Sequence, residues 1–267
     1  MRYNTEGWNA LLAMLSTGAI LGHNLWLLAS RKNEARLRLE MNTSDLFPLS
    51  ESAISPDRIA ALSLISSRGS LPVKEYQADG TSLVAEVDAP ESEVLLAALT
   101  LHPREITLGA EKFEHYLLEE DAHDAIAIRQ QTGQSGVDGR EIYTKYAKAV
   151  FQTEGAPDEA FGQVVGHRLE IVPQRNPCAL RIGDRLSIQV LFDGAPVAGL
   201  RVSGGGEQLE NGRYASQART AETGRAEIEI IGAGRCFVRT HLIRPHAETE
   251  IADWESFWAS LTFMVND

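Results

Sequence analysis

Beyond residue 30, apolar and polar positions mostly alternate in the way that is typical of β-strands. The stretch ARLRLEM (35–41) alternates strictly, while RIAALSLIS (58–66), SLVAEVD (82–88) and EVLLAALTL (93–101) are apolar runs bounded by Pro, Gly or Asp. The last run is apolar at nearly every position, which is typical of a strand buried on both faces. The pattern predicts a mostly β fold in this part of the chain.

Beyond Gly109 the apolar positions recur at helical intervals, first over residues 110–121 and again over 140–151. Acidic side chains occupy the opposite face of the first segment. We predict two amphipathic helices here, which form a helical insertion at about 109–151 in the first β domain. The apolar positions behind this prediction are Phe113, Tyr116 and Leu117, then Ile142, Tyr146, Ala147 and Val150.

A polar connector that contains Gly and Pro, residues 152–163, follows the insertion. We place a domain boundary there, between an N-terminal β domain (23–160) and a C-terminal β-sandwich domain (161–267). In the second domain the turn signals DG, NG, TG and AG separate short alternating runs, and WESFWASLTFMV (254–265) supplies a last strand. The predicted fold is mostly β, with two sandwich domains of immunoglobulin or transthyretin type.

Composition and charge narrow the classes of function. The chain has 267 residues, of which 43% are hydrophobic, so it can build a sizeable core. Its formal net charge is -12, and an acidic surface disfavours nucleic acid and anionic membranes as partners, but not cations.

The N-terminus carries an uncharged run, ALLAMLSTGAILG (10–22), that resembles the apolar region of a secretory signal. It is shorter than the roughly 20 apolar residues that span a membrane as a helix. We predict a signal peptide over residues 1–22 and a periplasmic or secreted protein. Cleavage after Gly22 would expose His23 as the first residue, whereas cleavage after Ala19 would not. A buried N-terminal helix or strand is the alternative that remains open.

Motifs for catalysis are absent from the sequence. It contains no GxSxG, HExxH or P-loop, and no nucleophile–base pair stands out, so we expect a protein that is not an enzyme. The two cysteines, Cys178 and Cys236, are not spaced like zinc ligands. They are interpreted as small buried hydrophobic residues, with a disulfide in an oxidising compartment as the alternative.

The histidines are the strongest candidates for functional residues, although most of the seven fit a surface or core role. A mature N-terminus at His23 would place an imidazole and an amine on one residue, and the two nitrogens can close a chelate. The amine has an ordinary pKa of about 7.7–8.0, so it can lose its proton near neutral pH when metal binds. A second imidazole would complete a site suited to nickel or copper.

Several segments, in order, resemble a bacterial secreted domain family of unknown function. They are HNLWL after the signal-like run, KFEHYLLEE, REIYTKYAKAV, LEIVPQRNPCALRIGDRLSIQVLFDGAPVAGLRV, TAETGRAEIEI and ADWESFWASLTF. Together they cover almost the whole chain after residue 22. Asn24 stands where the family usually has an acid.

The resemblance implies an exported protein with immunoglobulin-like domains and a role in metal capture. Members are often labelled as nickel-uptake proteins, periplasmic components that accompany energy-coupling-factor-type nickel or cobalt transporters. It implies His23 and His241 as metal ligands, with Ni²⁺ or Co²⁺ as the ion and Cu²⁺ less favoured. The implied partners are the metal ion and membrane transporter subunits.

A second class of function fits the same composition. The chain would then be a non-enzymatic module of the cell envelope that recognises protein or carbohydrate through its loops. Shared coordination of one ion by His23 and His241 separates the two hypotheses, because each imidazole nitrogen must approach the ion to about 2.0–2.1 Å.

Overall fold

The computed structural model describes residues 24–33, 35–88, 94–153, 160–208 and 214–266. With 53% of the residues in strands and 11% in helices, it confirms the mostly β prediction. The predicted signal peptide and His23 lie outside the described residues.

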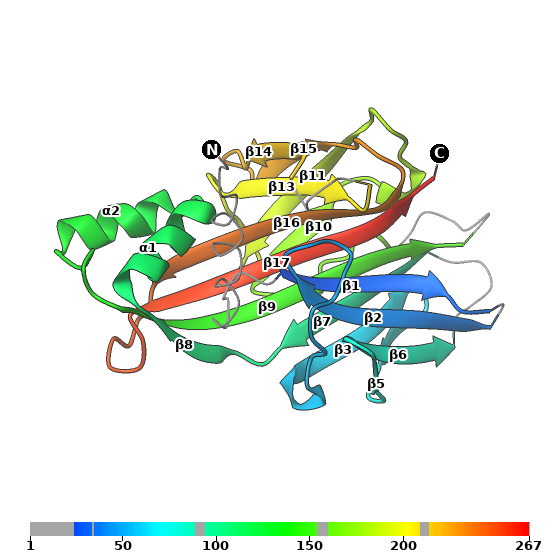
Figure 1. Ribbon diagram of the computed structural model, residues 1–267. Helices are drawn as coiled ribbons and strands as arrows, with labels where there is room; N and C mark the ends of the chain where they lie inside the picture. The colour runs from blue at the N-terminus through cyan, green and yellow to red at the C-terminus, as the bar shows by residue number, and fades with distance from the viewer. Residues whose placement is uncertain (1–23, 34, 89–93, 154–159, 209–213, 267) are drawn as a thin grey trace, which may run out of the picture.

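In the described part of the chain the strands form three sheets (Figure 1). The central sheet has the order β14 (Ser216–Arg219), β13 (Arg201–Gly206), β16 (Gly234–Pro245), β17 (Trp254–Val265), β9 (Gly139–Gln152), β7 (Val94–Leu101), β3 (Ile59–Ser66) and β4 (Gly69–Pro72), and β8 (Arg104–Leu108) also pairs with β9. The β1 sheet has the order β1 (Asn24–Arg31), β2 (Arg36–Ser44), β6 (Ser82–Asp88) and β5 (Gln77–Asp79). The β11 sheet contains β10 (Leu169–Pro173), β11 (Arg185–Phe192), β12 (Ala195–Pro196) and β15 (Arg225–Glu229).

The β1 and β11 sheets pack on opposite faces of the central sheet. On β7, Leu95, Ala97 and Leu99 belong to the apolar core shared with the β1 sheet. Their neighbours Leu96 and Ala98 belong to the core shared with the β11 sheet. Successive side chains of a strand point to opposite faces, so the central sheet is the common layer of two sandwich-like halves, and β7 is buried on both faces as predicted.

The central sheet takes strands from both sides of residue 160. β9 precedes this point and β17 follows it, yet the two strands pair in parallel from Trp254 opposite Glu141 to Thr262 opposite Ala149. The boundary predicted between residues 160 and 161 therefore does not divide the sheets.

The helix predicted over 140–151 is wrong, because this segment is the long strand β9. Three of its apolar positions, Ile142, Tyr146 and Val150, are spaced by four residues. A spacing of four fits one face of a helix, but it is also an even number and therefore fits one face of a strand. Hydrogen bonding to β7 on one side and β17 on the other satisfies the backbone of β9 as a strand.

The two helices pack on the same face of the central sheet as the β1 sheet does. α1 (Ala110–Glu119) confirms the predicted helix in this region, while α2 (His123–Gln131) was not predicted. Phe113 and Tyr116 of α1 pack against Trp254 and Trp258 of β17. Figure 1 shows both helices at the end where β17 begins and β16 ends.

A buried ion pair joins the central sheet to the β11 sheet. Nζ of Lys148 on β9 lies 2.8 Å from Oε1 of Glu170 on β10, and both side chains are only 1% exposed. The Glu170 carboxylate also accepts hydrogen bonds from the backbone N–H groups of Val165, Gly166 and His167. The pair therefore fixes the chain just before β10 against the central sheet.

Gly139→Ala should destabilise the protein by about 1–3 kcal/mol, as overpacking of a tight core does. A β-carbon at Gly139 would overlap the ring of Phe113, which seats α1 on β9. The free energy of unfolding from urea denaturation measures this loss. Gly136→Ala is the matched control, since a β-carbon there meets nothing within 4 Å. Equal stability of the two variants would contradict the close packing of α1.

Glu170→Ala should be more damaging than Lys148→Met. The first variant leaves the buried Lys148 ammonium without its carboxylate, and breaking such a pair costs about 3–5 kcal/mol. The second leaves Glu170 with three backbone donors and therefore costs less. Urea denaturation of both variants tests the order, and a larger loss for Lys148→Met would show that the backbone contacts do not support the carboxylate.

Candidate functional site

The predicted ligand His241 lies on β16 and is buried, with 7% of its surface exposed. Its Nε2 is 2.9 Å from the hydroxyl of Tyr116 on α1, and its ring lies 4.4 Å from that of Trp258 on β17. Burial lowers the pKa of His241 to about 3, although the charge of Glu120 opposes the shift. The ring is therefore neutral at physiological pH, which is the form that binds metals.

The hydroxyl of Tyr116 connects His241 to a buried carboxyl group. It lies 3.3 Å from Oε1 of Glu141, which also accepts a hydrogen bond from Ser256. The other oxygen of Glu141, Oε2, is buried and has no hydrogen-bond partner among the described residues. Burial raises the pKa of Glu141 to about 7, while the hydrogen bonds from Ser256 and Tyr116 oppose the shift.

A second group of charges also acts on His241. Arg239 is buried and donates to Glu120 and to the hydroxyl of Tyr214. Arg201 lies 3.6 Å from the same Glu120 carboxylate. Burial opposes ionisation of Glu120, but its interactions with Arg239, His241 and Arg201 together hold the pKa of Glu120 below its ordinary value. These ion pairs fix the end of α1 to β16 and β13.

His241 also lines a cavity of about 320 Å³ between the α1–α2 turn, the chain before β13, and β16. Arg219 and Asp121 form an ion pair at its wall, and His123 contacts the same Asp121 at 2.8 Å. The cavity gives His241 a polar approach from outside the core.

The described residues do not form a metal site by themselves. Among them, no three His, Cys, Asp or Glu side chains lie close enough together to hold a metal ion. His115 pairs with Glu119 on the surface of α1, and His167 stacks on Tyr146. Neither Cys178 nor Cys236 forms a disulfide with another described residue, and burial raises the pKa of Cys236 to about 12, so Cys236 is a packing residue.

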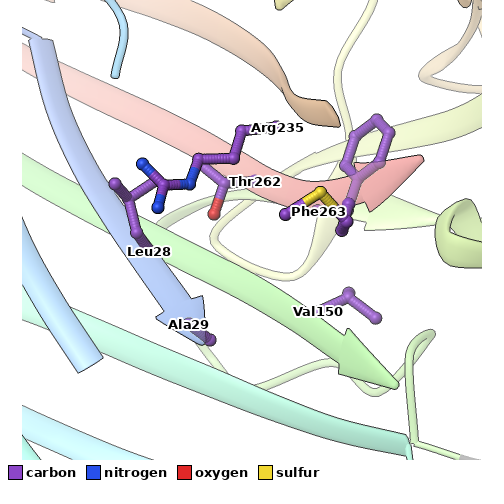
Figure 2. A pocket seen from close by; sticks show the side chains of 7 residues that line it. Leu28, Ala29, Val150, Arg235, Thr262 and Phe263 are labelled. Atoms are coloured by element: carbon purple, nitrogen blue, oxygen red, sulfur yellow. The ribbon is translucent and has the colours of Figure 1, made fainter. Parts of the chain in front are cut away.

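Another cavity lies between β1, β9 and the end of β17 (Figure 2). Its volume is about 20 Å³, enough for one water molecule. Aliphatic side chains such as Leu28 and Val150 line it beside Thr262. It is a packing gap and no ligand site.

β1 runs along the same face of β17 that carries Trp258. The hydroxyl of Ser260 donates to the carbonyl of Leu25 at 2.6 Å, and that of Thr262 donates to the carbonyl of Leu27. Since both residue numbers increase together, β1 and β17 run in the same direction at this contact.

The start of β1 contacts β17 near the residue that pairs with His241. Trp258, which is directly opposite His241 in the sheet, comes two residues before Ser260. Asn24 comes one residue before Leu25 and is buried. The start of β1 thus lies near the part of the central sheet where His241 sits.

The sequence pointed to His241 but not to its buried partners. A helix over 140–151 would place Glu141 and Lys145 on a polar outer face, whereas β9 buries both. Glu141, Tyr143 and Lys145 alternate with Ile142, Thr144 and Tyr146. Four of these six residues, Ile142, Tyr143, Thr144 and Tyr146, are β-branched or aromatic, a composition that favours strands and is the signal that could have revealed the buried partners.

Glu141→Gln should change how stability depends on pH. In the folded protein the pKa of Glu141 is about 7, compared with an ordinary value of 4.5, so the folded state keeps a proton that the unfolded chain has lost. Stability of the wild type therefore falls as pH rises from about 4.5 to 7, and the variant lacks this loss. The stability of the variant relative to wild type should rise by about 1–3 kcal/mol between pH 5 and pH 8.

Urea denaturation at several pH values measures this difference. Exposed Glu229 on β15 provides the control variant Glu229→Gln, which should parallel wild type at every pH. Parallel curves for Glu141→Gln and wild type would contradict the raised pKa.

In the described residues no helix is long and apolar enough to cross a membrane.

Comparison with known proteins identifies a family and finds a distant structural likeness. One similar solved structure is a biofilm associated protein (BSP domain) at 10% sequence identity and a TM-score of 0.20, a likeness too low to support any argument. The matched region covers 89% of this chain, which spans about half (51%) of that one. No curated protein matches.

A domain family of unknown function matches residues 20–244, which is most of the chain. The match begins at the end of the predicted signal peptide and includes both helices, β9 and His241. This protein belongs to the DUF4198 family of domains of unknown function.

Proposed function

We propose that this protein is an exported, periplasmic metal-binding protein that captures Ni²⁺ or Co²⁺ and supports its uptake by a membrane transporter. The observation that carries the proposal is that β1 starts against Ser260 of β17, two residues from the Trp258 that pairs with the buried, neutral His241. In the proposed site, His23 is the first residue of the mature chain and supplies its amine and its imidazole. His241 supplies a second imidazole.

The chemistry of His241 supports this assignment. A metal ligand must be deprotonated, and burial already keeps the imidazole neutral. Ligating histidines usually have their second ring nitrogen held by a hydrogen bond, and Tyr116 provides such a contact to Nε2. The other ring nitrogen, Nδ1, is then the proposed donor to the metal.

The lack of a three-ligand group among the described residues supports a role for the N-terminus in the proposed site. Because they hold no group of three potential ligands, a site at His241 needs donors from elsewhere. An N-terminal histidine brings two nitrogen donors at once, which suits nickel and cobalt. The acidic net charge of -12 also favours the approach of a cation.

The first experiment is the intact mass of the protein exported by a bacterial host, followed by calorimetric titration of the same sample with NiCl₂ and CoCl₂. We expect a chain that begins at His23 and binds one ion. His23→Ala should abolish binding, as should two extra residues placed before His23, which remove the free amine but leave the folded part unchanged. His241→Gln should weaken binding, whereas His115→Ala, on the exposed face of α1, should leave it unchanged.

A mature chain that begins elsewhere and binds no metal would overturn the proposal. The envelope interaction module would then be the better interpretation. If the protein with two extra residues before His23 binds nickel as tightly as the natural form, the N-terminal chelate is excluded. The protein would still be a metal-binding protein.

A further inference from the structure

A cationic cavity lies apart from the cavity beside His241. It has a volume of about 260 Å³ and lies between the loop after β2, the start of β3, the β7–β8 turn and β9. Three cationic residues, Arg58, Arg104 and Lys145, line it. None of the described residues that line it is an aspartate or a glutamate. Three converging cations are notable in a chain whose net charge is -12.

Aromatic rings hold two of these cations. Tyr143 lies between them, with the Arg58 guanidinium 5.9 Å and the Lys145 ammonium 5.4 Å from its ring centre. Lys145 also lies 5.2 Å from the ring of Trp258. A ring stabilises a cation without neutralising it, so contact with these rings does not cancel the positive charges.

Arg58 has hydrogen-bonding capacity left over. One NH₂ group donates to the carbonyl of His102 at 3.1 Å. The Nε–H is buried and has no hydrogen-bond partner among the described residues. A buried donor without a partner is rare in native proteins, and an anion or water in the cavity is the natural acceptor.

Carboxylates flank the cavity from outside its lining. Asp57 lies close enough to Arg104 and Arg58 for their charges to lower its pKa, after the larger effect of the hydrogen bond from Ser55. Asp45 is close enough to Lys145 to raise the pKa of the ammonium, although burial and the charge of Arg58 lower it further, to about 8. Glu141 also acts on Lys145 from outside the lining, so the acidic groups flank the cavity while the three cations line it.

We infer that Arg58, Arg104 and Lys145 form a binding site for a small oxyanion, a phosphate or a compact carboxylate. The planar fork of an arginine matches the oxygens of either group. The cavity has room for an anion of this size. A divalent cation is excluded as its occupant, because like charges would repel it. The site is separate from the proposed metal site and does not depend on it.

Titration calorimetry of the exported protein tests the inference. The protein is first treated with a chelator to remove metal, and inorganic phosphate, sulfate and citrate are then titrated at matched ionic strength in sodium chloride. We expect saturable binding of at least one anion, and the preferred anion separates the phosphate class from the carboxylate class.

Substitutions of the lining cations test whether the anion binds in this cavity. Arg104→Gln should raise the Kd about tenfold or more, since it removes one charge-assisted contact. Arg104 is exposed, so its replacement leaves the core intact. Lys145→Gln should have a similar or larger effect. The control is Arg185→Gln, an exposed arginine on β11 that pairs with Glu227, and it should leave the Kd unchanged.

Two results would overturn the inference. One is the absence of saturable binding of all three anions up to roughly 10 mM, the range of very weak ligands. The other is an unchanged Kd in the Arg58→Gln/Arg104→Gln double variant, which would place the anion elsewhere. Because all titrations use metal-free protein, neither result bears on nickel binding.

Discussion

The parallel pairing of β9 with β17 is the constraint on which the rest of the structure depends. These strands lie at the middle of the central sheet and come from distant parts of the chain. Parallel strands are usually buried on both faces, and here one face meets the β11 sheet while the other meets the helices and the β1 sheet. The two sandwich-like halves therefore share one layer and cannot be arranged independently.

This arrangement explains why polar side chains are buried beside the helices. The face of β9 and β17 under α1 carries Glu141, Ser256 and Trp258, and α1 covers them with Tyr116. A buried polar group is costly unless it is hydrogen-bonded. The network from His241 through Tyr116 to Glu141 supplies most of these bonds and gives the site a fixed geometry.

The same face combines two kinds of chemistry within a short distance. Near His241 it offers a neutral imidazole beside paired charges, where we propose that a metal ion binds with donors from the N-terminus. Near Tyr143 it offers cations held against aromatic rings, which suits an anion. Lys145 and Trp258 lie between the two, because they face each other across β9 and β17. The proposed cation site and the proposed anion site therefore do not overlap.

The sequence by itself determined the mostly β class, the extents of several strands and the helix at Phe113, because alternation and helical spacing are local properties of the chain. The alternation of Phe257, Ala259 and Leu261 likewise placed the last strand, β17, correctly. The structure of residues 140–151 was decided only in three dimensions, since apolar residues spaced by four fit both a helix and a strand. Contacts with β7 and β17, distant in the sequence, settle that choice and bury Glu141, Lys145 and Lys148. Which partners surround His241 and which cations meet at Tyr143 follows from those long-range pairings, which no local pattern encodes.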